Sequence, residues 1–165
     1  MITIGTVGKK IVNLDIKKLV GLLNKALADE WLAYYQYWVG AKVVQGMMRK
    51  LVEAELIEHA KEELEHAEKL VDRIVQLGGT PILQPKEWYQ YSNCGYEAPN
   101  NSDVVSLLKQ NIKGEQCAIG VYNYLVKLTK DKDPITYHLV LDILEDEVEH
   151  EEDLEAILSD IKKAK

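Results

Sequence analysis

Apolar residues recur at alternating spacings of three and four residues over four long stretches of the chain. This spacing places them along one side of an α-helix and is typical of helices that pack together as a bundle. We therefore predict an all-α fold, a four-helix bundle whose helices span about residues 13–45, 48–77, 101–130 and 133–161.

The ends of these helices are marked by residues that favour starts and stops. Asn13 or Asp15 can cap the first helix, and the aspartate–proline pair at 133–134 is a strong start for the fourth. Two glycines at 78–79 end the second helix. Residues 1–12 lack the helical pattern, and we predict a short irregular or extended arm there.

Residues 79–101 form the one long connection, and they hold three of the four prolines. Each flanking helix has about 30 residues and is therefore about 45 Å long. A connection of 23 residues can span that length, so the second and third helices can run parallel. The predicted bundle has one long crossover and forms a single domain over residues 1–165.

Each of the four predicted helices carries one glutamate where the pattern calls for an apolar residue. A carboxylate in a core is costly unless it is paired or binds a metal. In the second and fourth helices a histidine follows the glutamate by three residues, which places both side chains on one face. The pattern occurs twice, with 33 and 32 residues between the paired glutamates. The six candidate ligands are Glu30, Glu63, His66, Glu115, Glu147 and His150.

Carboxylates and imidazoles together suit Fe²⁺ or Mn²⁺. Four-helix bundles hold two such ions with one glutamate from each of two helices and a Glu-x-x-His pair from each of the others. We predict a site for two Fe ions per subunit, with Mn or Zn as possible substitutes. Glu63 and Glu147 are predicted to bridge the ions, and Glu30 and Glu115 to bind one ion each. Four carboxylates would then balance two divalent charges.

The chain is a weak repeat of two halves, and in each half one tyrosine follows the first glutamate by seven residues. Tyr37 follows Glu30 and Tyr122 follows Glu115, so each tyrosine shares a layer with its glutamate. They could donate hydrogen bonds to ligand carboxylates, supply electrons to the metal site, or simply pack in the core.

His59 and two cysteines are further candidates. His59 lies seven residues before His66, and we favour an exposed or partly exposed side chain over an accessory metal site. Cys117 is two residues after Glu115, about 200° round the helix, so we expect it to point away from the metal layer. It could pair with Cys94 if the crossover packs on the third helix, or both could be inert thiols.

The net charge of −7 argues against nucleic acid as the main partner, because phosphate binding needs a basic face. The N-terminal stretch lacks the apolar segment of a signal peptide. No stretch approaches the 18 apolar residues of a membrane span. We therefore expect a cytoplasmic protein without a membrane partner.

At these residues the chain resembles the ferritin-like superfamily, and it is similar to bacterioferritins over nearly all of its length. The resemblance rests on the six candidate ligands together with Tyr37 and Tyr122. It implies ferroxidase activity, the oxidation of Fe²⁺ at a di-iron site within one subunit. Leu64 stands where bacterioferritins have the methionine that binds haem, so we expect no haem.

The chain also ends 15 residues after His150, which leaves no room for the fifth helix of 24-subunit ferritins. Together with Cys94 and Cys117, these departures resemble the Dps-like proteins, also called thioferritins. That resemblance implies a homo-oligomer, a dodecameric cage that oxidises Fe²⁺ with hydrogen peroxide or O₂, stores ferric iron and protects against oxidative stress. It also implies that the two cysteines are a redox couple near the site.

Two other functions stay open. A rubrerythrin-like peroxidase would use the same di-iron site without storing iron, although the chain lacks the CxxC pairs of a rubredoxin module. A DNA-protecting protein of the Dps type would bind DNA through lysines near the two ends of the chain, which the net charge disfavours.

Overall fold

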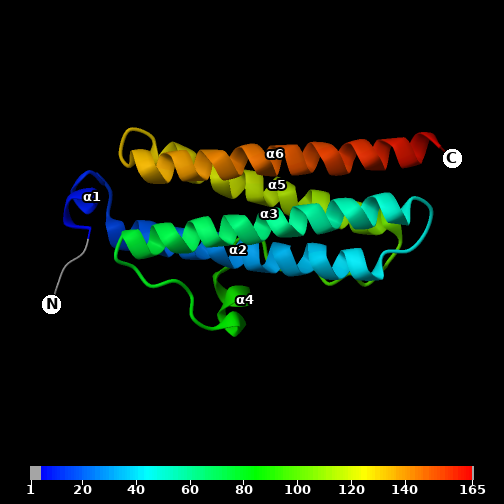
Figure 1. Ribbon diagram of the computed structural model, residues 1–165, viewed down its shortest axis with the longest axis horizontal. Helices are drawn as coiled ribbons and strands as arrows, with labels where there is room; N and C mark the ends of the chain where they lie inside the picture. The colour runs from blue at the N-terminus through cyan, green and yellow to red at the C-terminus, as the bar shows by residue number, and fades with distance from the viewer. Residues whose placement is uncertain (1–4, 165) are drawn as a thin grey trace.

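The computed structural model describes residues 5–164, which form helices joined by loops. The four long helices lie side by side along the long axis of the molecule (Figure 1). The predicted all-α four-helix bundle is confirmed, and every helix begins and ends within three residues of its predicted bounds. The long helices are α2 (Ile16–Val43), α3 (Arg49–Gln76), α5 (Val104–Thr129) and α6 (Pro134–Lys163).

Aspartate side chains cap three of these helices. The Asp15 carboxylate accepts a hydrogen bond from the amide of Lys18 at 3.1 Å, and Asp103 and Asp133 cap α5 and α6 in the same way. Each cap satisfies amides that have no partner inside the helix. The α3 helix is followed by Gly78, whose φ of 79° is the left-handed conformation that glycine adopts without strain.

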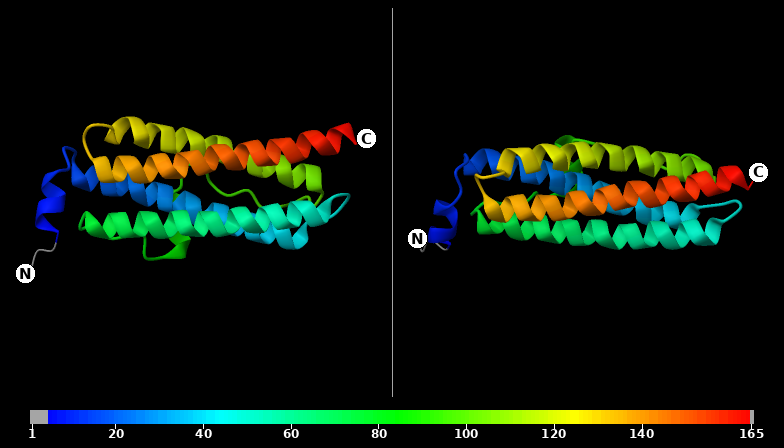
Figure 2. Two further views of the ribbon diagram at one scale, coloured as in Figure 1. Left: turned by 45° about the horizontal axis from the view of Figure 1, so that its top comes forward. Right: turned by 90° about the horizontal axis from the view of Figure 1, so that it is seen from above.

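The chain forms two antiparallel helix pairs, α2 with α3 and α5 with α6 (Figure 1). The crossover joins the two pairs and runs back along the length of the bundle, so α3 and α5 run parallel, as predicted (Figure 2). It also contains a 3₁₀ turn, η1 (Pro85–Glu87), and a short helix, α4 (Trp88–Tyr91), of which α4 packs against α2. The Trp88 ring stacks on Trp31 with centroids 5.2 Å apart.

The predicted N-terminal arm is wrong for part of its length. Thr6–Lys10 form a short helix, α1, which begins after Gly5 in a left-handed conformation. The amide of Asn13 donates to the carbonyl of Lys132 at 2.8 Å, which ties this segment to the loop between α5 and α6. Residues 1–4 of the predicted arm lie outside the described residues.

Buried apolar side chains form two clusters, one toward each end of the bundle. One surrounds Leu56 and Leu107, and the other surrounds Leu23 and Ile143. Between the two clusters the bundle buries charged and polar side chains instead. Within residues 5–164, none of the helices combines the length and the hydropathy that crossing a membrane requires.

Candidate metal centre

The polar middle of the bundle brings all six predicted ligands together. They form two groups that could each hold one ion, and all six side chains are buried. The two groups share Glu63 and Glu147, so these two carboxylates lie between the two candidate ion positions. The first group is Glu30, Glu63, His66 and Glu147, and the second is Glu63, Glu115, Glu147 and His150.

Both histidines direct their Nδ1 atoms into the centre. His66 Nδ1 lies 3.4 Å from Glu30 Oε2 and 3.3 Å from Glu147 Oε1. His150 Nδ1 lies 3.5 Å from Glu63 Oε1 and 3.7 Å from Glu147 Oε2. These distances exceed those of good hydrogen bonds, so the ligand atoms face one another across a shared space.

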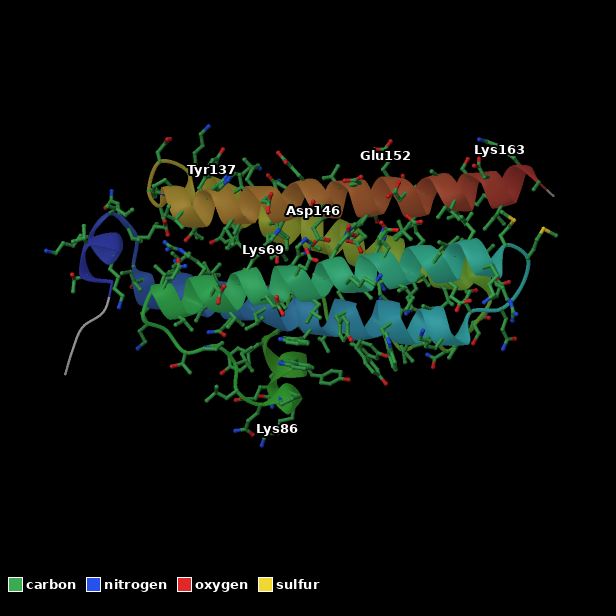
Figure 3. All side chains as sticks on the ribbon, viewed as in Figure 1. Lys69, Lys86, Tyr137, Asp146, Glu152 and Lys163 are labelled. Atoms are coloured by element: carbon green, nitrogen blue, oxygen red, sulfur yellow. A yellow bond between two sulfur atoms is a disulfide. The ribbon has the colours of Figure 1, made fainter. Side chains whose placement is uncertain are left out.

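The Nε2 atoms of the same histidines point outward to a carboxylate on the opposite helix. His66 Nε2 on α3 lies 2.9 Å from Asp146 Oδ2, which projects from α6 toward α3 (Figure 3). His150 Nε2 on α6 lies 2.8 Å from Glu62 Oε2 on α3. Such partners fix the ring orientation and leave Nδ1 as the atom that can bind a metal.

Each of the two tyrosines donates a hydrogen bond to a ligand glutamate in the other half of the chain. Tyr37 donates its hydroxyl hydrogen bond to Glu115, and Tyr122 donates to Glu30. Each tyrosine thus fixes the outer glutamate of the other half, and both side chains are buried. The arrangement gives them the hydrogen-bonding geometry that was one of the three roles considered from the sequence.

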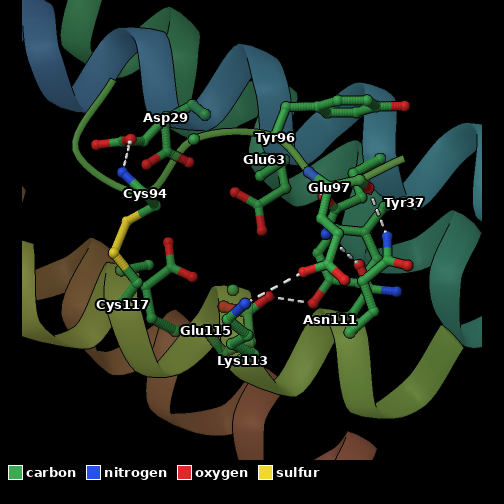
Figure 4. Close-up of a pocket in the computed structure, with 18 of the residues that line it drawn as sticks. Asp29, Tyr37, Glu63, Cys94, Tyr96, Glu97, Asn111, Lys113, Glu115 and Cys117 are labelled. Atoms are coloured by element: carbon green, nitrogen blue, oxygen red, sulfur yellow. Dashed lines mark hydrogen bonds and ion pairs between the residues drawn. A yellow bond between two sulfur atoms is a disulfide. The ribbon is translucent and has the colours of Figure 1, made fainter. Parts of the chain in front are cut away.

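A pocket of about 480 Å³ leads to the centre from the side of α2, α5 and the crossover. Its lining includes the carboxylates of Glu30, Glu63, Glu115 and Glu147. A disulfide between Cys94 and Cys117 forms part of the same wall (Figure 4).

Cys117 belongs to neither ligand group, yet its side chain lines the pocket that reaches the centre. Its side chain does lie on a different face of α5 from Glu115, but the crossover covers that face, and the space enclosed there reaches the centre. Of the two alternatives left open by the sequence, the structure shows the pairing of Cys94 with Cys117 and not two free thiols.

The crossover is held over this pocket by buried polar side chains of α2. The Asp29 carboxylate accepts hydrogen bonds from the amides of Asn93 and Cys94, at 2.7 and 2.8 Å. Gln36 accepts a third from the amide of Glu97 at 3.1 Å. Burial raises the pKa of Asp29, and the hydrogen bonds from the loop oppose that rise.

Comparison with known proteins agrees with this geometry. A family model described as a ferritin-like domain matches residues 20–164. The chain belongs to the ferritin-like family. Its structure is similar to that of the dodecameric thioferritin of Bacteroides fragilis, a bacterioferritin-related protein, with a TM-score of 0.95 and 47% sequence identity over 96% of both chains. The resemblance to thioferritins expected from the sequence is thereby confirmed.

Two further comparisons agree with this result, one in sequence and one in fold. The DNA protection during starvation protein of Pyrococcus furiosus is 36% identical over 148 residues, which cover 88% of this chain and 80% of the relative. The Dps of Thermosynechococcus elongatus has a TM-score of 0.81 at 16% identity, over 94% of this chain and 95% of that one. The last similarity concerns the fold alone.

The electrostatics of the ferritin-like centre are those of a site built for cations. Burial raises the pKa of Glu30 and Glu115, and the charges of Glu63 and Glu147 raise both further. Burial also opposes the ionisation of Glu63 and Glu147, but the nearby imidazoles of the two histidines outweigh it and lower both pKa values.

The histidines respond in the opposite direction. Burial disfavours the charged imidazole of His150, but the nearby carboxylates of Glu147 and Glu63 outweigh that effect and raise its pKa to about 12. The pKa of His66 is raised as well, because three carboxylates surround its Nδ1 against the same effect of burial. Without metal, protons therefore supply the positive charge that the carboxylates require.

The donor set fits two metal ions. Buried atoms without a hydrogen-bond partner cluster in the centre: Glu30 Oε2, Glu63 Oε1, both Glu147 oxygens, and Nδ1 of His66 and His150. Buried polar groups are rarely left without a partner, and these six atoms belong to five of the six ligand residues, all except Glu115. Carboxylate and imidazole donors at these positions suit iron or another first-row transition ion.

The expected exposure of His59 is wrong, because its side chain is 2% exposed. It lies beside the centre, where its ring stacks on His150 with centroids 4.1 Å apart and meets Tyr37 edge-on at 5.3 Å. Burial lowers the pKa of His59 to about 3, and the nearby His150 adds to that effect. His59 is therefore a neutral imidazole at physiological pH.

Three contributors to the site were missed from the sequence. Glu62 and Asp146 both hold a ligand histidine, and each immediately precedes the glutamate of a Glu-x-x-His pair. The repeat of that acidic residue in both halves was the sequence pattern that could have identified them. Asp29 gave no comparable pattern, because its partners lie 64 and 65 residues away in the crossover.

Proposed function

We propose that the protein oxidises Fe²⁺ at the centre formed by the six ligands, with hydrogen peroxide or O₂ as the oxidant, and stores the ferric product inside a homo-oligomeric cage. The observation that carries this proposal is the pair of overlapping ligand groups that share Glu63 and Glu147. Membership of the ferritin-like family supports it.

Two Fe²⁺ ions bound side by side supply the two electrons that one peroxide molecule requires. Each iron gives up one electron, the O–O bond breaks, and two protons from solvent complete two water molecules. Paired delivery avoids the one-electron cleavage that releases a hydroxyl radical. The protein's contribution is to hold both ions within reach of one oxidant molecule.

The surrounding residues have roles that follow from their contacts. Glu63 and Glu147 would bridge the ions, whereas Glu30 and Glu115 would each bind one ion while accepting a tyrosine hydrogen bond. The pocket that reaches these carboxylates gives a small oxidant a way in.

The disulfide offers a redox role of its own. When reduced, Cys94 and Cys117 hold two further electrons in the wall of the pocket that reaches the centre. This position supports the redox couple that the thioferritin resemblance implies.

The storage step rests on the assembly. The related thioferritin of Bacteroides fragilis is dodecameric, and we propose the same hollow dodecamer for this chain. Size-exclusion chromatography with light scattering tests this directly. A twelve-subunit particle that retains hundreds of iron atoms supports storage, whereas a dimer excludes it and leaves a di-iron peroxidase.

The di-iron assignment is tested by Glu63→Ala against Glu65→Ala. Glu63 is buried in both ligand groups, whereas Glu65 is two residues away on the same helix and exposed. Stopped-flow measurement of Fe²⁺ oxidation should show the rapid phase lost in the first variant and kept in the second. Rapid oxidation by Glu63→Ala would show that the centre lies elsewhere.

DNA protection is a second candidate, favoured by the name of the Pyrococcus furiosus relative. Removing Fe²⁺ and peroxide protects DNA chemically without contact, and a net charge of −7 disfavours direct binding. We therefore propose protection by consumption of the reactants. A gel shift that shows tight DNA binding at physiological salt would replace this proposal with direct binding.

A further inference from the structure

The Cys94–Cys117 disulfide borders two pockets. The first is the pocket of about 480 Å³ that reaches the centre, and both cysteines line it (Figure 4). The second, which we call the α5 groove, has a volume of about 300 Å³, and Cys117 lines it whereas Cys94 does not. One end of the same bond is thus shared by both spaces. The α5 groove is lined by Leu22, Asn93, Cys117, Gly120, Val121, Tyr124 and Leu125.

The α5 groove is uncharged and open to the outside. None of its lining residues is aspartate, glutamate, lysine or arginine. Cys117, Gly120 and Tyr124 recur at spacings of three and four residues, so they follow one face of α5. The side chain of Tyr124 is 52% exposed. An apolar groove alone assigns nothing, but this one has a disulfide at its end, and a disulfide reacts with thiolates.

Gly120 leaves the approach to that bond free. It lies nearly one turn after Cys117 on α5, and a β-carbon added there would meet no atom of another segment within 4 Å. Glycine inside a helix is destabilising relative to alanine and is typical of places where another molecule comes close to the backbone. Gly21 on α2 has the same free space but lies outside the groove, so it is the natural control for Gly120.

We propose that a dithiol protein docks in the α5 groove and reduces the disulfide by attacking Cys117. This inference rests on the redox role of the disulfide in the proposed function, and it adds the class of reductant and the sulfur that is attacked. The groove offers no charged partner to the carboxylates and the ammonium group of glutathione. An apolar loop that carries a cysteine would instead bury its surface against Leu22, Val121 and Tyr124.

The exchange proceeds in two steps. A partner thiolate attacks Cys117 Sγ, the bond between the two cysteines breaks, and Cys94 leaves as a thiolate that takes up a proton. The partner's second thiolate then attacks the partner's own sulfur in the mixed disulfide, and Cys117 leaves and takes up a proton. The chain gains two electrons and two protons, and the partner becomes a disulfide. The second step is intramolecular for a dithiol, and a monothiol lacks that advantage.

The fold keeps the two sulfurs together after the bond breaks. The Asp29 carboxylate accepts hydrogen bonds from the amides of Asn93 and Cys94, at 2.7 and 2.8 Å. These contacts involve no sulfur atom, so they persist in the reduced protein and hold Cys94 beside Cys117. Both thiols then stay in the wall of the pocket that reaches the centre, where they can close again as they give up their electrons.

The test uses the oxidised, metal-free protein and reduced thioredoxin, recycled by its reductase and NADPH, as the dithiol probe. We expect reduction at least about tenfold faster than by glutathione at equal thiol concentration. Gly120→Leu fills the groove and should slow the thioredoxin reaction at least about tenfold, because the loop can no longer approach. Gly21→Leu makes the same change in equal free space outside the groove and should keep the wild-type rate.

Two further measurements make the result specific. The equilibrium of the disulfide with dithiothreitol should be the same in all three proteins, which shows that Gly120→Leu changes access and not the bond. Thioredoxin that lacks its second cysteine should trap a mixed disulfide, and peptide mass spectrometry should find it on Cys117. A trap on Cys94, or equal rates with thioredoxin and glutathione, overturns the proposal.

The variants also decide whether another molecule occupies the groove. An unchanged thioredoxin rate in Gly120→Leu overturns the proposal, and so does a changed particle size, which would show that a second copy of the chain covers the groove. No iron is present in these assays, so the two proposals fail separately. Slow reduction beside normal Fe²⁺ oxidation rejects this inference alone, and fast reduction without Fe²⁺ oxidation rejects the ferroxidase function alone.

Discussion

Metal binding at the centre should release protons. In the metal-free protein, His66 and His150 hold their Nδ1 atoms among ionised carboxylates, which raises the pKa of both rings despite their burial. A metal can bind Nδ1 only after that proton leaves. Each ring keeps its Nε2 proton, because Nε2 faces Asp146 or Glu62 and not the metal position.

The expected number follows from the ligand set. Two ions displace one proton from each histidine, so filling the centre at pH 7 should release at least two protons per subunit. Glu30 and Glu115, whose pKa values are raised, can add up to two more. One proton per ion makes the apparent affinity about tenfold weaker, or ~1.4 kcal/mol, for each unit by which the pH falls.

The direction of this pH effect is set by the raised histidine pKa values. Below about pH 12, where His150 is protonated in the metal-free protein, every rise in pH removes competing protons and strengthens metal binding.

Isothermal titration of Co²⁺ under argon in two buffers of different ionisation enthalpy measures the protons released. Glu63→Ala is the control, since it removes a ligand shared by both metal positions and should lower the count. Release of fewer than two protons per subunit at pH 7 in the wild-type protein would refute the reasoning, because it would mean that the histidines are neutral before metal binds.

Three stability predictions follow from other contacts, each measured by urea unfolding of the metal-free protein. Arg73→Met leaves the fully buried Asp133 carboxylate without its partner at 2.8 Å and should lower the free energy of unfolding by about 3–5 kcal/mol; a loss below ~1 kcal/mol contradicts this. Tyr122→Phe removes a hydrogen bond to a buried carboxylate and should cost about 1–3 kcal/mol, so an unchanged midpoint argues against that contact. Reducing the Cys94–Cys117 disulfide, which closes a loop of 23 residues, should cost roughly 3 kcal/mol; equal stability with and without reductant would contradict the loop-closure argument.

The helices and the ligand set could be predicted because both depend on local spacing. Alternating spacings of three and four residues require one buried stripe per helix, and a glutamate within that stripe must be compensated. Glu63 and His66 share a face whatever the rest of the fold does, since three residues are nearly one turn. Once four such helices pack, their inward positions must meet at the same level.

Other features depend on which part of the chain covers a helix face, and spacing does not determine that. His59 is buried because α6 places the His150 ring over it. Cys117 reaches the pocket because the crossover closes over α5 and encloses its face together with the centre. Asp29 is buried because loop amides far along the chain need an acceptor.

The two halves of the internal repeat contact each other through the residues of the centre, and these contacts constrain how the centre can form. Each outer glutamate accepts its hydrogen bond from the tyrosine of the other half, and each ligand histidine contacts an acid of the other half. A half on its own would therefore bury carboxylates and imidazoles without their partners, at a cost of several kcal/mol. The polar layer thus disfavours either helix pair alone and favours the complete bundle. The same groups that hold the metal ions also link the correct pairing of the two halves to the formation of the site.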